Sequence, residues 1–236
     1  MRKSFATLAA LVLATSSASA AVIDDFSAPS GGQTVTQTTI GSNSQTLIGL
    51  GSSVIGGTRQ VNVTITSFSA VGVNGSASVK IQNPSAGAAE INADSNTDAT
   101  ETFGYGTTSD LNVDLTNGGL SNAFIIRLLL TDLPSLANAN SITVSTTGGG
   151  SSTATFTIPG LVGNGNPSPF DVVVPYASFT GTANFTDLDT IGLAINGPRS
   201  SDYTFDFIST NSVPEPASLS LFAVGAMGVL SRRKRA

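Results

Sequence analysis

The sequence of 236 residues contains no cysteine, no histidine and no tryptophan. The lack of cysteine excludes disulfide bonds and thiol catalysis, and the lack of histidine removes the commonest general base and transition-metal ligand. Ser-His-Asp and Cys-His catalytic groups and His/Cys zinc sites are therefore excluded. Carboxylate chemistry remains, either as paired acids or as oxygen ligands for calcium. Because nothing in the sequence points to such a catalytic pair, we predict that the protein is not an enzyme.

Charged residues make up only 11% of the chain, and they are unevenly distributed. Residues 21–212 include fourteen acidic residues but only four basic ones. Such an acidic surface repels nucleic acid and anionic lipid, so no nucleic-acid partner is expected. It suits an exported protein that has to stay soluble or to hold cations.

The start of the chain has the three parts of a secretory signal peptide. A basic start, Met-Arg-Lys, precedes an apolar stretch at 5–14, and Ala18-Ser19-Ala20 supplies the small residues of a cleavage site. The sequence therefore predicts a signal peptide at 1–20, with cleavage between Ala20 and Ala21 and export of the rest of the chain.

Residues 21–212 are rich in serine, threonine, glycine and asparagine, but apolar side chains recur at every second position in short segments. In VNVTITS, Val61, Val63 and Ile65 fall on one face and polar residues on the other, which is typical of a half-buried strand. The same alternation occurs at 77–81, 111–115, 142–144, 154–158, 191–195 and 203–207, with glycine- and asparagine-rich turn signals between. We predict one all-β domain at 21–212, folded as a single antiparallel β-sandwich of the jelly-roll kind.

Two further segments of this domain have distinct patterns. The apolar run AFIIRLLLTDLP predicts a central strand buried on both faces, with a helix as the alternative, and Arg127 within it is expected to face a partner or a sheet end. The segment IPGLVGNGNPSPFD, residues 158–171, predicts a long exposed loop.

The densest acidic cluster lies in NADSNTDATE. Asp94, Asn96 and Asp98 alternate along the chain, a spacing at which short oxygen side chains converge on a hard cation, and Glu101 offers a further ligand. The segment departs from an EF-hand loop, because the glycine and the final glutamate of that loop are both missing. Two interpretations stay open: a calcium site made by these four residues, and a solvated acidic turn between strands, of which the turn is favoured.

A second set of acidic residues lies in FTDLDTIG, where Asp187 and Asp189 are two positions apart. We expect them to cap a local turn. A carboxylate cluster with Asp202 and Asp206 is the alternative.

The last 24 residues have three parts in a fixed order. Val213, Pro214, Glu215 and Pro216 open a motif at 213–218, an apolar stretch occupies 217–230, and Arg232, Arg233, Lys234 and Arg235 form a basic tail at 232–235. The apolar stretch predicts a transmembrane helix, and the basic residues predict that its C-terminal end stays in the cytoplasm. The prolines cannot continue a helix, so they would present an extended peptide at the outer boundary of the membrane.

Residues 213–236 resemble the PEP-CTERM sorting signal of Gram-negative bacteria in all three parts. The resemblance implies sorting by an exosortase, a membrane transpeptidase that recognises Pro214-Glu215-Pro216, followed by removal of the tail. It also implies an association with extracellular polysaccharide and biofilms.

The body of the chain resembles other PEP-CTERM ectodomains in two short motifs, Asp24-Asp25-Phe26-Ser27 and Gly56-Gly57-Thr58-Arg59. Its segments 113–132 and 179–197 look like strands of galactose-binding-like jelly-roll domains. This second resemblance implies a sandwich fold, and it carries no binding residues over to this chain.

The sequence thus predicts an exported protein that its C-terminal helix holds at the inner membrane, with the domain outside the cytoplasm, until an exosortase processes it. It would then act at the cell surface or in the extracellular matrix as a structural or interaction protein. The alternative is a module that binds an extracellular polysaccharide, either with calcium as a cofactor or without it. Without tryptophan, such binding would depend on tyrosine, on Asp and Asn hydrogen bonds or on a metal.

Overall fold

A computed structural model describes residues 20–27, 32–70, 72, 74–81, 87–137, 139–163 and 167–211. The predicted signal peptide, apart from Ala20, and the predicted C-terminal helix lie outside these residues. Within the described part of the chain, no helix is long and apolar enough to cross a membrane. The body, Ala20–Val213, forms one compact unit.

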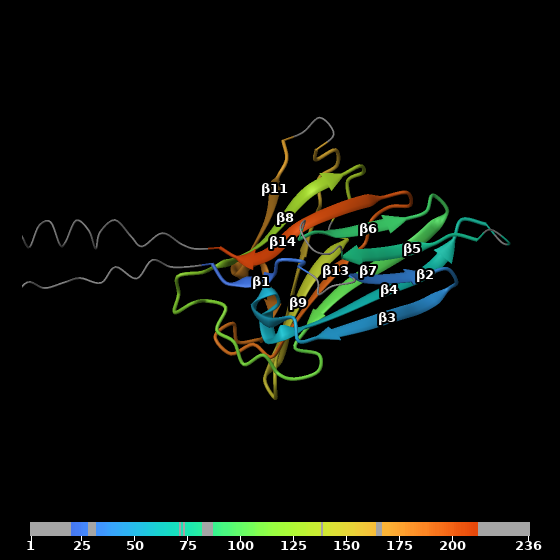
Figure 1. Ribbon diagram of the computed structural model, residues 1–236. Helices are drawn as coiled ribbons and strands as arrows, with labels where there is room; N and C mark the ends of the chain where they lie inside the picture. The colour runs from blue at the N-terminus through green and yellow to red at the C-terminus, as the bar shows by residue number, and fades with distance from the viewer. Residues whose placement is uncertain are drawn as a thin grey trace, which may run out of the picture. The chain divides into compact units, whose positions relative to one another are not determined.

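Two antiparallel sheets of seven strands each make up this body (Figure 1). The first sheet has the order β11 (Phe170–Pro175), β8 (Ala123–Thr131), β14 (Asp202–Thr210), β6 (Ala89–Ala93), β5 (Ala77–Ile81) and β2 (Gln33–Gln37), with β1 (Val22–Asp24) also paired to β14. The second has the order β12 (Thr180–Gly181), β10 (Gly150–Phe156), β9 (Asn140–Thr146), β13 (Thr190–Ile195), β7 (Thr97–Tyr105), β4 (Thr58–Phe68) and β3 (Gly41–Ile48). Three short 3-10 turns, η1 (Gly51–Ser53), η2 (Ile55–Gly57) and η3 (Tyr176–Ser178), complete the described elements.

The chain passes from one sheet to the other at most of its connections. After β2, two strands that follow each other in the chain belong to the same sheet in four described cases: β3 and β4, β5 and β6, β9 and β10, and β12 and β13. Every other described connection after β2 crosses to the opposite sheet. This repeated crossing confirms the predicted antiparallel sandwich of the jelly-roll kind.

The core lies between the two sheets and is built by the alternation seen in the sequence. In β4, the side chains of Val61, Val63 and Ile65 are buried, while the threonine and asparagine between them reach the outer surface. The predicted strands at 77–81, 142–144, 154–158, 191–195 and 203–207 are confirmed as β5, β9, β10, β13 and β14, although β10 ends at Phe156. No cysteine is needed for this arrangement because aliphatic and aromatic burial supplies the stabilisation.

The predicted strand at 111–115 is wrong. Val113 makes only an isolated bridge to Leu188, and the chain then enters a turn. Asn112 and Asn117 have φ angles of 49° and 48°, in the left-handed region that interrupts a strand. The Asp114 carboxylate accepts hydrogen bonds from the backbone N–H groups that follow it, including that of Thr116 at 2.8 Å. This local bonding outweighs the apolar alternation.

The apolar run from Ala123 to Thr131 forms strand β8, as predicted, and it lies between β11 and β14. The loop predicted at 158–171 is less exposed than expected. Ile158 and Val162 are fully buried, and β11 already begins at Phe170. Thr131 fixes this loop, because its hydroxyl donates to the carbonyl oxygen of Pro159 at 2.7 Å.

The two short motifs of the body meet inside the sandwich. Asp24 of the first motif and Arg59 of the second form an ion pair in which both side chains are fully buried. The hydroxyl of Tyr105 and the backbone N–H of Phe26 also donate to Asp24. The Phe26 ring packs edge-on against Phe103, with their centroids 5.5 Å apart. The motifs are therefore structural, because they fasten β1 to β4 and β7 of the opposite sheet.

Candidate interaction surface on the first sheet

Arg127 lies on the outer face of the first sheet, within a group of charged and aromatic side chains that contact one another. The register of β8 and β11 places it directly opposite Asp171. Its Nε donates to Asp171 Oδ1 at 2.7 Å and its Nη2 donates to Oδ2 at 2.8 Å. This two-point geometry is the strongest form of an arginine–carboxylate pair and holds the guanidinium plane in a fixed orientation.

A β-bulge in β14 brings an aromatic ring onto the same group. Phe205 pairs with Leu128 and Phe207 pairs with Arg127, so Asp206 has no partner across the ladder. The extra residue turns Phe207 to the side where Arg127 lies, and the guanidinium carbon is 4.5 Å from the ring centroid. The arginine is thus fixed by a carboxylate on one neighbouring strand and by a ring on the other.

The charges of the group reinforce one another. The hydrogen bonds that Arg127 donates to Asp171 raise the pKa of Arg127, burial acts against this rise, and the nearby Asp206 carboxylate adds to it. Conversely, the Arg127 hydrogen bonds lower the pKa of Asp171. Both side chains are about one-third exposed, at 33% and 38%, so the pair stays charged and remains accessible to a ligand.

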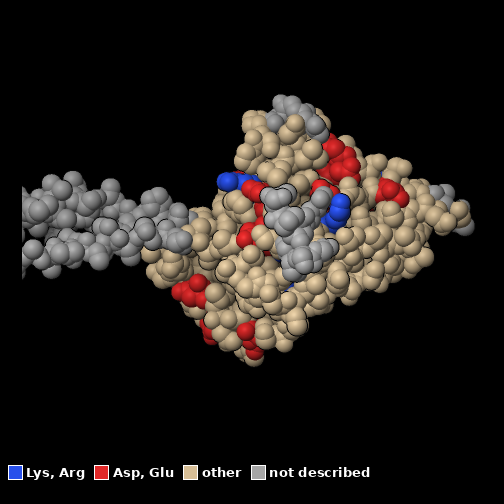
Figure 2. Space-filling model, in the orientation of Figure 1, with Lys and Arg blue, Asp and Glu red and all other residues tan. Residues whose placement is uncertain are grey.

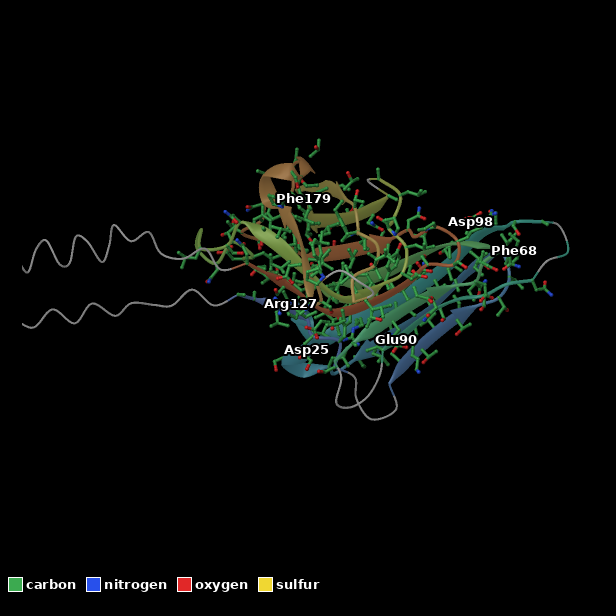
Figure 3. All side chains as sticks on the ribbon, turned by 90° about the horizontal axis from the view of Figure 1, so that it is seen from above. Asp25, Phe68, Glu90, Asp98, Arg127 and Phe179 are labelled. Carbon is green, nitrogen blue, oxygen red and sulfur yellow. The ribbon has the colours of Figure 1, made fainter. Side chains whose placement is uncertain are left out.

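Apolar side chains border the charged group. Val173 on β11 is 55% exposed and lies opposite Ile125 of β8, two residues along each strand from the ion pair. Figure 3 places Arg127 and Glu90 along the same side of the molecule, and Figure 2 shows basic side chains beside acidic ones on the face that it displays.

We call Arg127, Asp171, Val173 and Phe207 the Arg127 surface. It can bind a ligand through fixed donors, acceptors and a ring, but arginine supplies no proton transfer near neutral pH.

A second arginine–aspartate pair provides a useful comparison. Arg199 donates to both carboxylate oxygens of Asp98, with Nε–Oδ1 at 2.8 Å, and the hydroxyl of Ser67 also donates to that carboxylate. The two side chains are 39% and 40% exposed. No aromatic ring is described against Arg199, so this pair lacks the stacking seen at Arg127.

The four residues of the predicted calcium site are not brought to one point. Asp94 accepts from the Ser76 backbone and hydroxyl groups, and Asn96 donates to the carbonyl oxygen of Asn74. Asp98 and Glu101 lie on opposite faces of β7, since they are three positions apart and the faces of a strand alternate at every position. No group of three or more acidic residues that could hold a metal occurs in the described segments.

Glu101 points into the sandwich and is 2% exposed. Its Oε1 atom has no hydrogen-bond partner, and burial raises its pKa to about 8. The side chain is therefore neutral at pH 7, which makes it a poor calcium ligand.

The other predicted carboxylates have separate roles. Asp189 accepts from the backbone N–H of Thr147, 42 positions earlier in the chain, so it bonds to the turn after β9 rather than capping a turn of its own segment. Asp206 lies at the bulge beside Arg127. Burial raises the pKa of Asp202, and the carboxylates that add to this rise are Asp132 and Asp94.

The predicted cleavage site lies beside the last strand of the domain, β14. Ala20 and Ala21 are described whereas Ala18 is not, and Ala21 exchanges hydrogen bonds with Thr210 at the end of β14. Asn211 follows, and its Oδ1 accepts from the backbone N–H groups of Asn122 and Ala123 at 2.9 and 2.8 Å. The chain therefore enters and leaves the sandwich at one end, and Asn211 fixes the exit.

The residues predicted to direct sorting and orientation lie beyond Asn211, outside the described residues. They are Val213, Pro214, Glu215 and Pro216, together with Arg232, Arg233, Lys234 and Arg235.

The structure above defines an all-β sandwich protein, and the sequence comparison adds a sorting signal. A family model described as a PEP-CTERM protein-sorting motif matches residues 212–235. The chain therefore carries a PEP-CTERM sorting motif directly after its sandwich domain. No curated protein matches the sequence.

Among solved structures, the chain is similar to carbohydrate-binding modules. A family 11 carbohydrate-binding module from Clostridium thermocellum, in complex with a β-1,3-1,4-mixed-linked tetrasaccharide, is 12% identical with a TM-score of 0.42, and the match covers 85% of this chain and 100% of that one. The family 11 module of the cellulosomal cellulase Lic26A-Cel5E of the same organism is 14% identical with a TM-score of 0.40, over 85% of this chain and 99% of that one.

Sequence reasoning singled out Arg127 but not its partners. Asp171 lies 44 residues away in the chain, and the pairing depends on the register of β8 and β11. Phe207 lies in a segment whose alternation predicted a strand, and only the bulge reveals that it leaves the core pattern. An arginine inside an otherwise apolar strand was the one available signal.

Proposed function

We propose that this chain is an exported surface protein that an exosortase sorts through Pro214-Glu215-Pro216, and that its sandwich serves as a structural or interaction module. The observation that carries the proposal is the PEP-CTERM match at residues 212–235. The match overlaps all three parts of the tail: the proline-glutamate motif, the apolar stretch and the basic end.

The end of the sandwich supports this proposal. Asn211 is tied to the start of β8 through its side chain, and Pro214 is three positions later in the sequence. Three residues reach at most about 10 Å. A processing enzyme that recognises Pro214 would therefore work close to the folded domain.

A double variant tests sorting directly. We expect Pro214→Ala with Glu215→Ala to leave the protein in the membrane fraction with its tail, whereas the unchanged chain loses the tail. A matched control, Ser220→Ala with Gly225→Ala, alters the apolar stretch of the same tail, leaves residues 213–218 unchanged and should behave like the unchanged chain. Identical location and mass for the double variant and the unchanged chain would rule out recognition through this motif.

We further propose that the domain binds rather than catalyses. Histidine- and cysteine-dependent catalysis is excluded by composition. Among the described carboxylates, Asp24, Asp98 and Asp171 are each held by an arginine. A screen on a panel of polysaccharides checks this, since release of reducing ends or of unsaturated sugars would require a different account of the carboxylates.

A second candidate function, polysaccharide binding, is favoured by the Arg127 surface. Sugar hydroxyls both donate and accept hydrogen bonds, and a fixed guanidinium beside a carboxylate offers both partners in one plane. The Phe207 ring and exposed Val173 add apolar area against which a sugar ring can pack. No calcium is invoked, because the predicted calcium ligands do not converge.

Affinity electrophoresis in gels that contain extracellular polysaccharide of the producing bacterium tests this second function. We expect retardation of the unchanged protein and its loss in Arg127→Ala and in Phe207→Ala. Arg199→Ala is the matched control, since it breaks an equally exposed arginine–aspartate pair that has no ring. Two outcomes would rule out the Arg127 surface as a sugar site. In the first, all three variants are retarded as much as the unchanged protein; in the second, the unchanged protein itself is not retarded.

A further inference from the structure

Strand β3 (Gly41–Ile48) is the free edge of the second sheet. It pairs with β4 along its whole length, from Gly41 opposite Ile65 to Ile48 opposite Thr58. No described strand pairs with its other side, and six of its eight side chains are exposed. Figure 1 shows β3 as an outermost strand of the body. Its outward N–H and C=O groups therefore form a template for another strand.

This edge lacks the devices that usually prevent strand pairing. No charged residue and no proline occurs anywhere from residue 33 to residue 58. The other edges differ: β11 carries Asp171 and ends at Pro175, and β12 has only two residues. β2 is a five-residue strand whose Thr36 carbonyl accepts from the side chain of Asn43 in β3. Among the edge strands that the structure describes, only β3 is long, uncharged and free of proline.

The strand is also complementary to itself. Ile40 and Ile48 are the two most exposed large hydrophobic residues of the described chain, at 65% and 75%. Ser44 lies four residues from each of them. When two identical strands pair antiparallel, opposed residues must share a face, so a pairing can be centred on one residue. Centred on Ser44, Ser42 of one copy lies opposite the partner's Thr46, and Ile40, which directly precedes the strand, comes near the partner's Ile48 at each end.

We propose that β3 pairs with β3 of a second copy of this chain, antiparallel and centred on Ser44. The pairing joins the second sheets of the two copies into one continuous sheet and buries two isoleucine pairs that are otherwise exposed. Because the domain is acidic, copies repel one another through most of their surface, and the uncharged β3 edge is where they approach without that cost. Gln33 Nε2 donates to the carbonyl oxygen of Gln45 at 3.2 Å, and the second lone pair of that oxygen remains for the partner.

This inference deepens the interaction role proposed above, and it depends neither on exosortase recognition nor on the Arg127 surface. A chain that is not processed at Pro214, or that binds no polysaccharide, can still pair through β3. Failure of the pairing would leave the sorting proposal intact.

The absence of cysteine allows a direct test. The full chain is expressed with its own signal and tail, and the exported protein is oxidised with copper phenanthroline and run on a non-reducing gel. Opposed residues in antiparallel strands have Cα atoms about 4.5–5.5 Å apart, within the range of a disulfide. We expect Ser44→Cys to give a covalent dimer. Ser42→Cys is the matched control, because the two copies of residue 42 would lie about 13 Å apart.

Register is tested by combining positions. Ser42→Cys with Thr46→Cys should restore the cross-link, since these positions oppose each other in the proposed pairing. Sedimentation of the cysteine-free protein gives a measurement without cross-links: we expect a dimer, and we expect Thr46→Lys to shift it to monomer with an unchanged melting curve. A monomer for the unchanged protein, or equal cross-linking of Ser42→Cys and Ser44→Cys, would overturn the proposal.

Discussion

Asp24 and Arg59 form a two-point ion pair inside the sandwich, with Nε–Oδ2 at 2.6 Å and neither side chain exposed to solvent. The two residues lie 35 positions apart and belong to the two short motifs of the body. Burial raises the pKa of Asp24, and the hydrogen bonds from Arg59, Phe26 and Tyr105 oppose that rise. A charge of this kind is tolerated only while its partner is present.

Removal of one partner should therefore destabilise the protein strongly. We expect Arg59→Ala to lower the free energy of unfolding by about 3–5 kcal/mol, because it leaves a buried carboxylate without its cation. The double change Asp24→Leu with Arg59→Met should be less destabilising than Arg59→Ala alone. Urea denaturation of the unchanged protein and these two variants measures this, and a double change that costs as much as Arg59→Ala or more would contradict the coupling.

Glu101 should make stability depend on pH. Its pKa is raised from 4.5 to about 8 by burial, so the folded state holds a proton that the unfolded state has lost between these two values. Stability should therefore fall as pH rises from about 4.5 to about 8, by roughly 1.4 kcal/mol per unit, and then level off. Glu101→Gln should remove this fall. Denaturation midpoints from pH 4 to 9 check it, and the same slope in the variant would assign the effect elsewhere.

Asn211 should control the stability of the exit from the domain. Its Oδ1 accepts three hydrogen bonds, including those from the backbone N–H groups of Asn122 and Ala123. We expect Asn211→Ala to lower the free energy of unfolding by about 1–3 kcal/mol, since it leaves backbone donors unpaired. Asn211→Asp keeps the acceptor and should cost less. Hydrogen exchange at Ala123 reports the local effect, and unchanged protection in Asn211→Ala would contradict it.

Gly106, directly after β7, should tolerate no side chain. Its φ is 75°, and a Cβ atom there would lie 2.0 Å from the carbonyl oxygen of Asp189. We expect Gly106→Ala to destabilise the fold by more than about 3 kcal/mol, since backbone must move. Gly118→Ala is the control, because φ is 66° but no atom lies within 4 Å, so only the backbone strain of about 1 kcal/mol remains. Similar melting temperatures for the two variants would contradict the clash.

The strands that bury one face could be predicted from the sequence because their apolar residues alternate. Val61, Val63 and Ile65 show this in β4. β3 could not be found in this way, since most of its side chains are exposed on both faces and its register depends only on β4. The segment at 111–115 alternates as a strand does, but the left-handed angle of Asn112 and the turn at Asp114 prevail.

The candidate sites were predictable to different degrees. The sorting motif is a continuous stretch, so the sequence alone contained it. The Arg127 surface needs the register of β8 with β11 and a bulge opposite Arg127, neither of which has a local signature. The spacing of the acidic residues predicts calcium ligands, but on strand β7 Glu101 points inward whereas Asp98 points outward, so the two cannot bind one ion.

The measurement that tests the central claim most directly is intact-mass spectrometry of the protein isolated from membrane and medium of its own bacterium, with and without the exosortase. We predict a chain that begins at Ala21 and ends near Pro214-Glu215-Pro216 only when the enzyme is present, with any added mass identifying what the protein is attached to. A chain that still ends at Ala236 in the membrane, whether or not the enzyme is present, would contradict sorting by exosortase.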